Sequence, residues 1–82
     1  MKKRLKKIIG PIVESENLIF KGVDIDEGDQ KRTITVIIDK KNEAVDVNDC
    51  VRISKIIDPI LEEEDLFKGK SYFLTVSSPG SS

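Results

Sequence analysis

A run of β-branched residues, Thr33-Ile34-Thr35-Val36-Ile37-Ile38, constrains the fold more than any other part of the chain. β-Branched side chains lose rotamer freedom in a helix and pack well on the pleated surface of a sheet. The run therefore predicts a strand, and the turn-forming segment Glu27-Gly28-Asp29-Gln30 before it favours a hairpin. We expect residues 19–27 and 31–39 to pair as antiparallel strands.

The first and last expected strands alternate between two faces. In the first, interrupted at Gly22, one side comprises Ile19, Val23 and Ile25, and the other Phe20, Asp24 and Asp26. In the last, Tyr72, Leu74 and Val76 alternate with Phe73, Thr75 and Ser77, and Pro79-Gly80 ends the strand. The sheet face away from the core is expected to expose Phe20, Ile37 and Phe73 among Asp24, Asp26, Thr33, Thr35 and Ser77.

Residues 2–16 have the spacing of an amphipathic helix. The apolar positions on its expected stripe are Leu5, Ile8, Ile9, Ile12 and Val13. Pro11 lies inside this pattern and lacks an N–H, so we expect the helix to bend or to split near Gly10.

A second helix is expected to start near Val47. Asp46 is a suitable N-cap, and Asp49 favours the positive N-terminal end of the helix. Its predicted apolar stripe comprises Val47, Cys50, Ile53, Ile57, Ile60 and Leu61, with the small Ser54 among them for close approach to a sheet. Pro59 falls on the solvent side and predicts a kink or an early end near Asp58.

The expected order is α-β-β-α-β, and each helix has one apolar stripe. The simplest packing that buries both stripes places both helices on one face of a three-stranded sheet, which makes the fold class α+β. The length of 82 residues fits a single domain over residues 1–82, without internal repeat or linker.

Composition excludes several classes of function. His is absent and Cys50 is the single cysteine, so no internal disulfide and no ordinary His/Cys metal site can form. Cys50 lacks a neighbour that would activate it, and its place on the apolar stripe predicts a core thiol. No calcium-loop spacing occurs among the aspartates. We expect no enzyme activity, no cofactor, no metal and no small-molecule substrate, in a reducing cytoplasm and without a membrane segment.

The clearest electrostatic feature is basic, although the net charge is -1 and cannot drive nucleic-acid binding by itself. Five basic residues fall at the start of the first helix: Lys2, Lys3, Arg4, Lys6 and Lys7. Two interpretations are open, a surface that contacts phosphates and a solvated terminus that keeps the domain soluble.

Three other features also have two interpretations each. The acidic run Glu62-Glu63-Glu64-Asp65 is a solvated helix end or a contact for a basic protein. The segment Ser77, Ser78, Pro79 and Gly80 is a turn that leads out of the last strand or a contact loop. The aromatic residues on the exposed sheet face suggest base stacking, but the neighbouring Asp24 and Asp26 would repel phosphate, which favours a protein-binding surface.

Three stretches together resemble the ribosome maturation factor RimP family. Residues 45–55, Val-Asp-Val-Asn-Asp-Cys-Val-Arg-Ile-Ser-Lys, are similar to that family's helix start. Residues 72–80, Tyr-Phe-Leu-Thr-Val-Ser-Ser-Pro-Gly, are similar to its final strand and turn. The hairpin residues 23–26 and 36–39 and the Gly10-Pro11 helix also fit, in the same order along the chain.

The resemblance implies a non-catalytic factor that binds the small ribosomal subunit during its assembly, and the amino-terminal α+β domain of that family. The expected partners are a basic ribosomal protein and ribosomal RNA. It also implies a second, β-barrel domain after the turn, which is absent from the 82 residues; both an excised domain and a naturally short relative are consistent with this. The resemblance favours a role of Ser77, Ser78, Pro79 and Gly80 in orienting that second domain over a role in binding. The alternative function is a free-standing RNA-binding module that acts through the basic amino-terminal helix.

Overall fold

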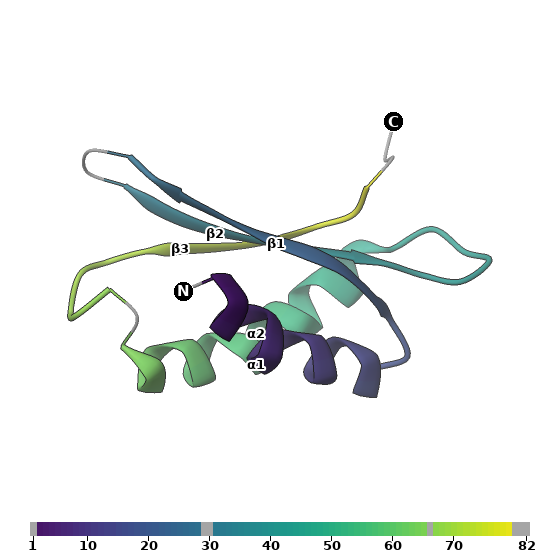
Figure 1. The fold of residues 1–82 in the computed structure, drawn as a ribbon. Coiled ribbons are helices and arrows are strands. Elements are labelled where there is room, and N and C mark those ends of the chain that lie inside the picture. The colour runs from purple at the N-terminus through teal and green to yellow at the C-terminus, as the bar shows by residue number, and fades with distance from the viewer. Residues whose placement is uncertain (1, 29–30, 66, 80–82) are drawn as a thin grey trace.

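The computed structural model describes residues 2–28, 31–65 and 67–79. Helix α1 covers Lys2–Ser15, strand β1 Ile19–Glu27, strand β2 Arg32–Asp39, helix α2 Val47–Glu64 and strand β3 Phe73–Ser77. Both helices lie on the same face of the sheet, so the fold has two layers (Figure 1). The predicted α+β class, element order and placement of the helices are confirmed.

The sheet is mixed, with the strand order β1-β2-β3. β1 and β2 form the expected antiparallel hairpin, with Glu27 opposite Arg32 at its closed end. β3 pairs parallel to β2, with Thr33 opposite Phe73 and Ile37 opposite Ser77. Because parallel neighbours need a crossover connection, α2 is the element that joins β2 to β3 across the covered face.

The hydrophobic core lies between the sheet and the two helices. The predicted apolar stripe of α1 supplies three buried side chains. Along β2, buried and partly buried side chains alternate, as expected for a strand with one face against the core. The core residues are Leu5, Ile9, Val13, Leu18, Val23, Ile34, Val36, Ile38, Ile53, Ile57, Leu61 and Phe67. A core built from both helices, the hairpin and the loop after α2 makes the described residues one packing unit.

A bulge in β1 overturns the predicted faces at its beginning. The pairing with β2 shifts between Phe20 and Gly22, which adds one residue to β1 and reverses the alternation there. Phe20 therefore packs against the core, beside Gly10 of α1, instead of facing away from the helices. Ile19, expected on the covered side with Val23, is 40% exposed. The prediction was wrong for Phe20 and Ile19 because period-two spacing fails across a bulge.

The two prolines do not end their helices. α1 continues through Pro11 to Ser15, and α2 continues through Pro59 to Glu64, so the predicted split near Gly10 and the predicted early end near Asp58 were wrong. The alternative of a bend or kink at each proline stays a prediction. Both prolines are exposed, so water can hydrogen-bond the carbonyl that each leaves without an N–H partner. Packing of the opposite helix face against the core stabilises both helices.

The predicted cap of α2 is confirmed, and it explains an error in the predicted stripe. Asp46 accepts a hydrogen bond from the N–H of Asn48, and its own N–H donates to Asp49 Oδ2 at 3.1 Å, which completes a capping box. The capping box turns Asp49 inward, in one row with Ile53 and its successors. Val47 lies two residues earlier, about 200° around the helix axis, and is 77% exposed.

Candidate functional site

The predicted basic cluster lies on the exposed side of α1. All five side chains, Lys2, Lys3, Arg4, Lys6 and Lys7, are exposed. Lys2 Nζ lies 3.3 Å from Asp24 Oδ1 on β1, and Arg4 forms an ion pair with Glu64 at the end of α2. The structure therefore divides the cluster into two residues that pair with other elements and three that extend into solvent.

The second group comprises Lys3, Lys6 and Lys7. Within residues 2–28, 31–65 and 67–79, no carboxylate lies within ion-pair distance of any of these three ammonium groups. Lys3 is one helical turn from Lys7 and three residues from Lys6, so the three charges share one side of the helix. Such an arrangement attracts anions, and like charges at this spacing do not stabilise the helix.

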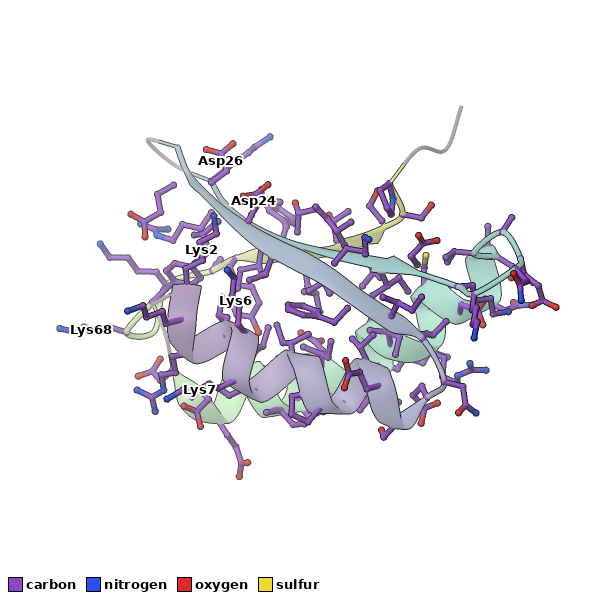
Figure 2. All side chains as sticks on the ribbon, turned by 45° about the vertical axis from the view of Figure 1, so that its right-hand side comes forward. Lys2, Lys6, Lys7, Asp24, Asp26 and Lys68 are labelled. Atoms are coloured by element: carbon purple, nitrogen blue, oxygen red, sulfur yellow. The ribbon has the colours of Figure 1, made fainter. Side chains whose placement is uncertain are left out.

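A further lysine, which the sequence did not predict as part of the site, lies at this end of the molecule. Figure 2 shows Lys68, on the loop after α2, at the same end of the molecule as Lys2, Lys6 and Lys7. The ion pair between Arg4 and Glu64 holds the start of α1 next to the end of α2, four residues before Lys68. No local signal in the sequence could have found Lys68, because its neighbours on the surface are about sixty positions away in the chain.

The predicted turn after β3 is only partly within the described residues. Ser77 is the last residue of β3 and pairs with Ile37, Ser78 is half-buried, and Pro79 lies exposed in a turn. Gly80 lies outside the described residues. The described part agrees with a turn that leads the chain out of the sheet.

The uncovered face of the sheet is mixed in polarity. Strand pairing aligns Asp26, Thr33 and Phe73 in one row and Asp24, Thr35 and Thr75 in the next. Phe73 is 58% exposed, whereas Phe20 lies on the other face. The predicted pair of exposed aromatic rings is therefore reduced to one, which removes the geometric basis for base stacking on two rings.

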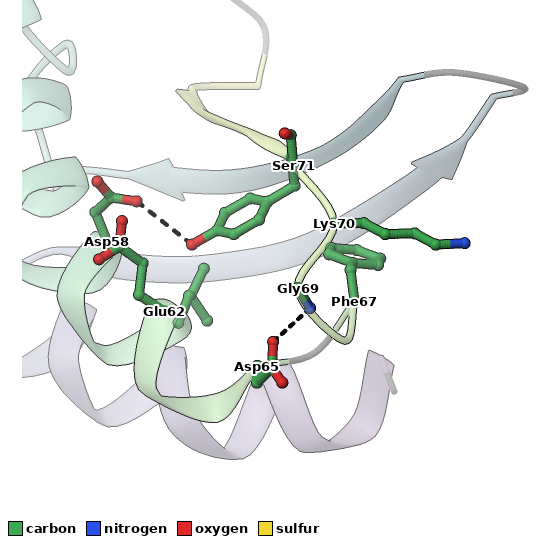
Figure 3. A pocket seen from close by; sticks show the side chains of 9 residues that line it. Asp58, Glu62, Asp65, Phe67, Gly69, Lys70 and Ser71 are labelled. Carbon is green, nitrogen blue, oxygen red and sulfur yellow. Dashed lines mark hydrogen bonds between the residues drawn. The ribbon is translucent and has the colours of Figure 1, made fainter.

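A cavity of about 400 Å³ lies between the end of α2 and the start of β3 (Figure 3). Carboxylates of the predicted acidic run and one further aspartate line it, together with two aromatic rings whose centroids are 5.7 Å apart. Its lining comprises Asp58, Leu61, Glu62, Asp65, Phe67, Gly69, Lys70, Ser71 and Tyr72.

Several polar groups of this cavity hydrogen-bond to one another. Tyr72 Oη donates a hydrogen bond to Asp58 Oδ1 at 3.4 Å, and Gly69 N–H donates to Asp65 Oδ1 at 2.7 Å. Burial raises the pKa of the Tyr72 phenol, and the nearby charges of Asp58 and Glu62 raise it further. The phenol therefore stays protonated at neutral pH, where it is a poor base and a poor nucleophile.

Cys50 is half-buried on α2, beside a shallow groove that it lines with Val51, Ser54, Lys55 and Val76. Burial raises the pKa of its thiol, and the charges of Asp49 and Asp46 act in the same direction. A raised pKa leaves little reactive thiolate at neutral pH. The sequence predicts a core thiol, whereas Cys50 is only partly buried and packs against the core without belonging to its fully buried set. Among the described residues, no three Cys, Asp or Glu side chains are placed to hold a metal ion.

None of the helices in the described part of the chain is long and apolar enough to span a bilayer.

The comparison with protein families matches residues 8–82 to the RimP N-terminal domain. This match covers most of α1, the hairpin, α2 and β3, and confirms the resemblance drawn from the sequence. The RimP family comprises non-catalytic ribosome maturation factors associated with the small ribosomal subunit. The chain belongs to the RimP family, as its N-terminal domain.

Proposed function

We propose that this domain binds the small ribosomal subunit during its assembly in the cytoplasm and assists maturation by binding alone. The observation that supports this most is the family match over residues 8–82. Two surfaces of opposite charge, at the start of α1 and at the end of α2, supply the means of binding. The proposed partners are ribosomal RNA and a basic ribosomal protein.

On the RNA side, the proposed contact is the basic cluster of α1. The cluster comprises Lys2, Lys3, Arg4, Lys6 and Lys7. Their exposed ammonium and guanidinium groups suit phosphate oxygens, and displacement of counterions makes such binding strongly dependent on salt. The net charge of -1 requires these contacts to be local.

On the protein side, the proposed contact is the acidic end of α2. Glu62, Glu63 and Asp65 are exposed there, whereas Glu64 is half-buried and paired with Arg4. Glu62 and Asp65 line the cavity of Figure 3 together with Asp58. Carboxylates gathered on one surface favour a partner with the opposite charge and increase its association rate.

The turn of Ser77, Ser78, Pro79 and Gly80 is proposed to orient a second domain relative to this one or to contact the subunit. Proline fixes its own φ and restricts the residue before it, so the Ser-Pro pair gives the chain a defined exit direction. The single core shared by the helices and the hairpin supports the proposal that residues 1–82 act as one domain.

The test is co-sedimentation of the purified domain with isolated small or large ribosomal subunits at low and at moderate salt. We expect selective retention on small subunits, weakened but not abolished by salt. Equal retention on both subunits, with equal affinity for free RNA, would instead favour a free-standing RNA-binding module. Absence of retention on small subunits at low salt would refute the proposed function.

A further inference from the structure

Four exposed lysines at one end of the molecule are here called the lysine face: Lys3, Lys6, Lys7 and Lys68. Three come from the first turns of α1 and one from the loop after α2, and Figure 2 shows Lys6, Lys7 and Lys68 at the same end of the molecule. In the described part of the chain, none of the four has a carboxylate within ion-pair distance. Their charge is therefore available to a partner.

Lys2 and Arg4 differ from these four because they are already paired. Lys2 Nζ lies 3.3 Å from Asp24 Oδ1 and connects α1 to β1. Arg4 pairs with Glu64 and connects α1 to the end of α2. The Glu64 side chain is only 28% exposed, so loss of Arg4 would leave a poorly solvated carboxylate without its cation. These two residues hold the helix in place.

The lysine face has no stabilising role of its own. Lys3 and Lys7 are at i and i+4, and like charges at this spacing destabilise a helix. A turn of helix rises about 5.4 Å, so the two ammonium groups can reach successive anionic groups along a chain. Lys68, from a different element, extends the charge across the end of the molecule.

We propose that the lysine face binds the phosphate backbone of an RNA strand. Lys2 and Arg4 do not contact RNA; their ion pairs connect α1 to β1 and to α2, respectively, and are here called the clasp. This inference rests on the proposed function and reduces its five-residue cluster to three residues, with Lys68 added. An anionic membrane is the other polyanion to consider. It is disfavoured because the apolar side of α1, with Leu5, Ile9 and Val13, is buried in the core and cannot insert into lipid.

The test compares three variants of the domain. The first replaces all four members of the lysine face: Lys3→Gln, Lys6→Gln, Lys7→Gln and Lys68→Gln. The second is a control matched in net charge, at exposed lysines elsewhere: Lys21→Gln, Lys31→Gln, Lys41→Gln and Lys55→Gln. The third is the clasp variant, Lys2→Gln with Arg4→Gln.

The probe is a fluorescent single-stranded polyuridylate of about 20 nucleotides, titrated between about 50 and about 200 mM salt. We expect the lysine-face variant to bind at least about tenfold more weakly at low salt, with a salt slope shallower by about 2–3. The matched control should stay within about threefold of the wild type, because it removes the same charge from other places. The clasp variant should unfold at a lower temperature and keep the wild-type slope.

Four results would overturn the inference. One is an equal loss in the lysine-face and control variants, which would show an effect of net charge alone. The second is a reduced salt slope in the clasp variant, measured well below its unfolding temperature. The third is binding to anionic lipid vesicles but not to the polyuridylate. The fourth is a wild-type domain that binds small subunits but no free RNA, together with a lysine-face variant that is retained on small subunits as well as the wild type. In that case the proposed function would stand and the inference would fail.

The experiment can also show that the inference holds while the proposed function fails. If the wild-type domain binds the polyuridylate through the lysine face but is not retained on small subunits, the inference stands and the proposed function fails. Circular dichroism and thermal unfolding of each variant show whether it is folded. Single substitutions at Lys3, Lys7 and Lys68 provide the same comparison with less change in charge.

Discussion

The ammonium group of Lys40 lies 3.0 Å from Oδ2 of Asp49, which is the one buried charged side chain among residues 2–28, 31–65 and 67–79. Lys40 directly follows β2, and Asp49 is in the first turn of α2, so the ion pair joins the sheet to the helix that covers it. Asp49 also contacts Arg52 at 3.2 Å, and Arg52 in turn pairs with Glu16, just after α1, at 2.9 Å. One carboxylate thus links both helices and the central strand.

This ion pair should make stability depend on pH at both ends of the range. The hydrogen bond from Lys40 and the N–H of Asp46 lower the pKa of Asp49, so its contribution is present above its unfolded pKa of about 3.9 and lost as pH falls through the folded value. The hydrogen bond to Asp49 raises the pKa of Lys40, so its contribution is present below about 10.4 and lost as pH rises through the folded value.

Asp49→Asn should therefore lower the free energy of unfolding at pH 7 and flatten its fall below about pH 4. Urea unfolding measured from acid to neutral pH checks this. Glu63→Gln is the control, because Glu63 is exposed and has no ion pair among the described residues. An Asp49→Asn protein with the wild-type acid dependence would contradict the assignment.

The N-cap of α2 gives a second prediction. Asp46→Ala removes the side-chain acceptor for the N–H of Asn48 and should lower the free energy of unfolding by about 1 kcal/mol. Asp46→Ser should restore most of the loss, since a serine hydroxyl can accept the same bond. The measurement is thermal unfolding of both variants and of the wild type. Equal melting temperatures for Asp46→Ala and the wild type would mean that the cap contributes little.

Local chemistry explains which parts of the fold were predictable. The β-branched run of β2, the turn before it and the Asp46 cap each act within a few residues, and each was confirmed where the structure describes it. The bulge at Phe20 and Gly22 was missed because only the pairing with β2 reveals the extra residue. Val47 was misplaced for a different, local reason: the capping box turns Asp49 inward, and Val47 then lies on the solvent side of α2.

The candidate site was predictable in composition but not in arrangement. Five basic residues at the start of the chain are plain in the sequence. That Lys2 pairs with Asp24, Arg4 pairs with Glu64, and Lys68 lies nearby depends on contacts between distant segments. Helical spacing gives the positions of charges around one helix and says nothing of which carboxylates another element brings to them.

The core should respond to volume changes in a graded way. Ile57 is fully buried between α2 and the sheet, so Ile57→Val should cost about 0.5–1.5 kcal/mol of unfolding free energy and Ile57→Ala about 2–5 kcal/mol. A domain of this size has little stability to lose, so the alanine variant should unfold at a clearly lower temperature than the wild type. Val51→Ala, at a residue 44% exposed on the same helix, is the control and should change stability much less.

Cys50 should react slowly with alkylating reagents in the folded domain. Burial and the charges of Asp49 and Asp46 raise its pKa, which leaves little thiolate at neutral pH. We expect the iodoacetamide rate at pH 7 to rise when the chain is unfolded in urea. A folded-state rate equal to that of the unfolded chain would contradict the burial of this thiol.

Pro59 should reduce the stability of α2 even though the helix tolerates it. Its ring removes one hydrogen bond in the middle of Val47–Glu64, and it crowds the carbonyl of Lys55 one turn earlier. Because Pro59 is exposed and none of the core side chains depends on it, Pro59→Ala should raise the free energy of unfolding by about 1–3 kcal/mol. The measurement is urea unfolding followed by circular dichroism, with Pro79→Ala, outside the helices, as the matched control. A lower stability of Pro59→Ala would mean that the reduced freedom of the unfolded chain at proline outweighs the lost helical hydrogen bond.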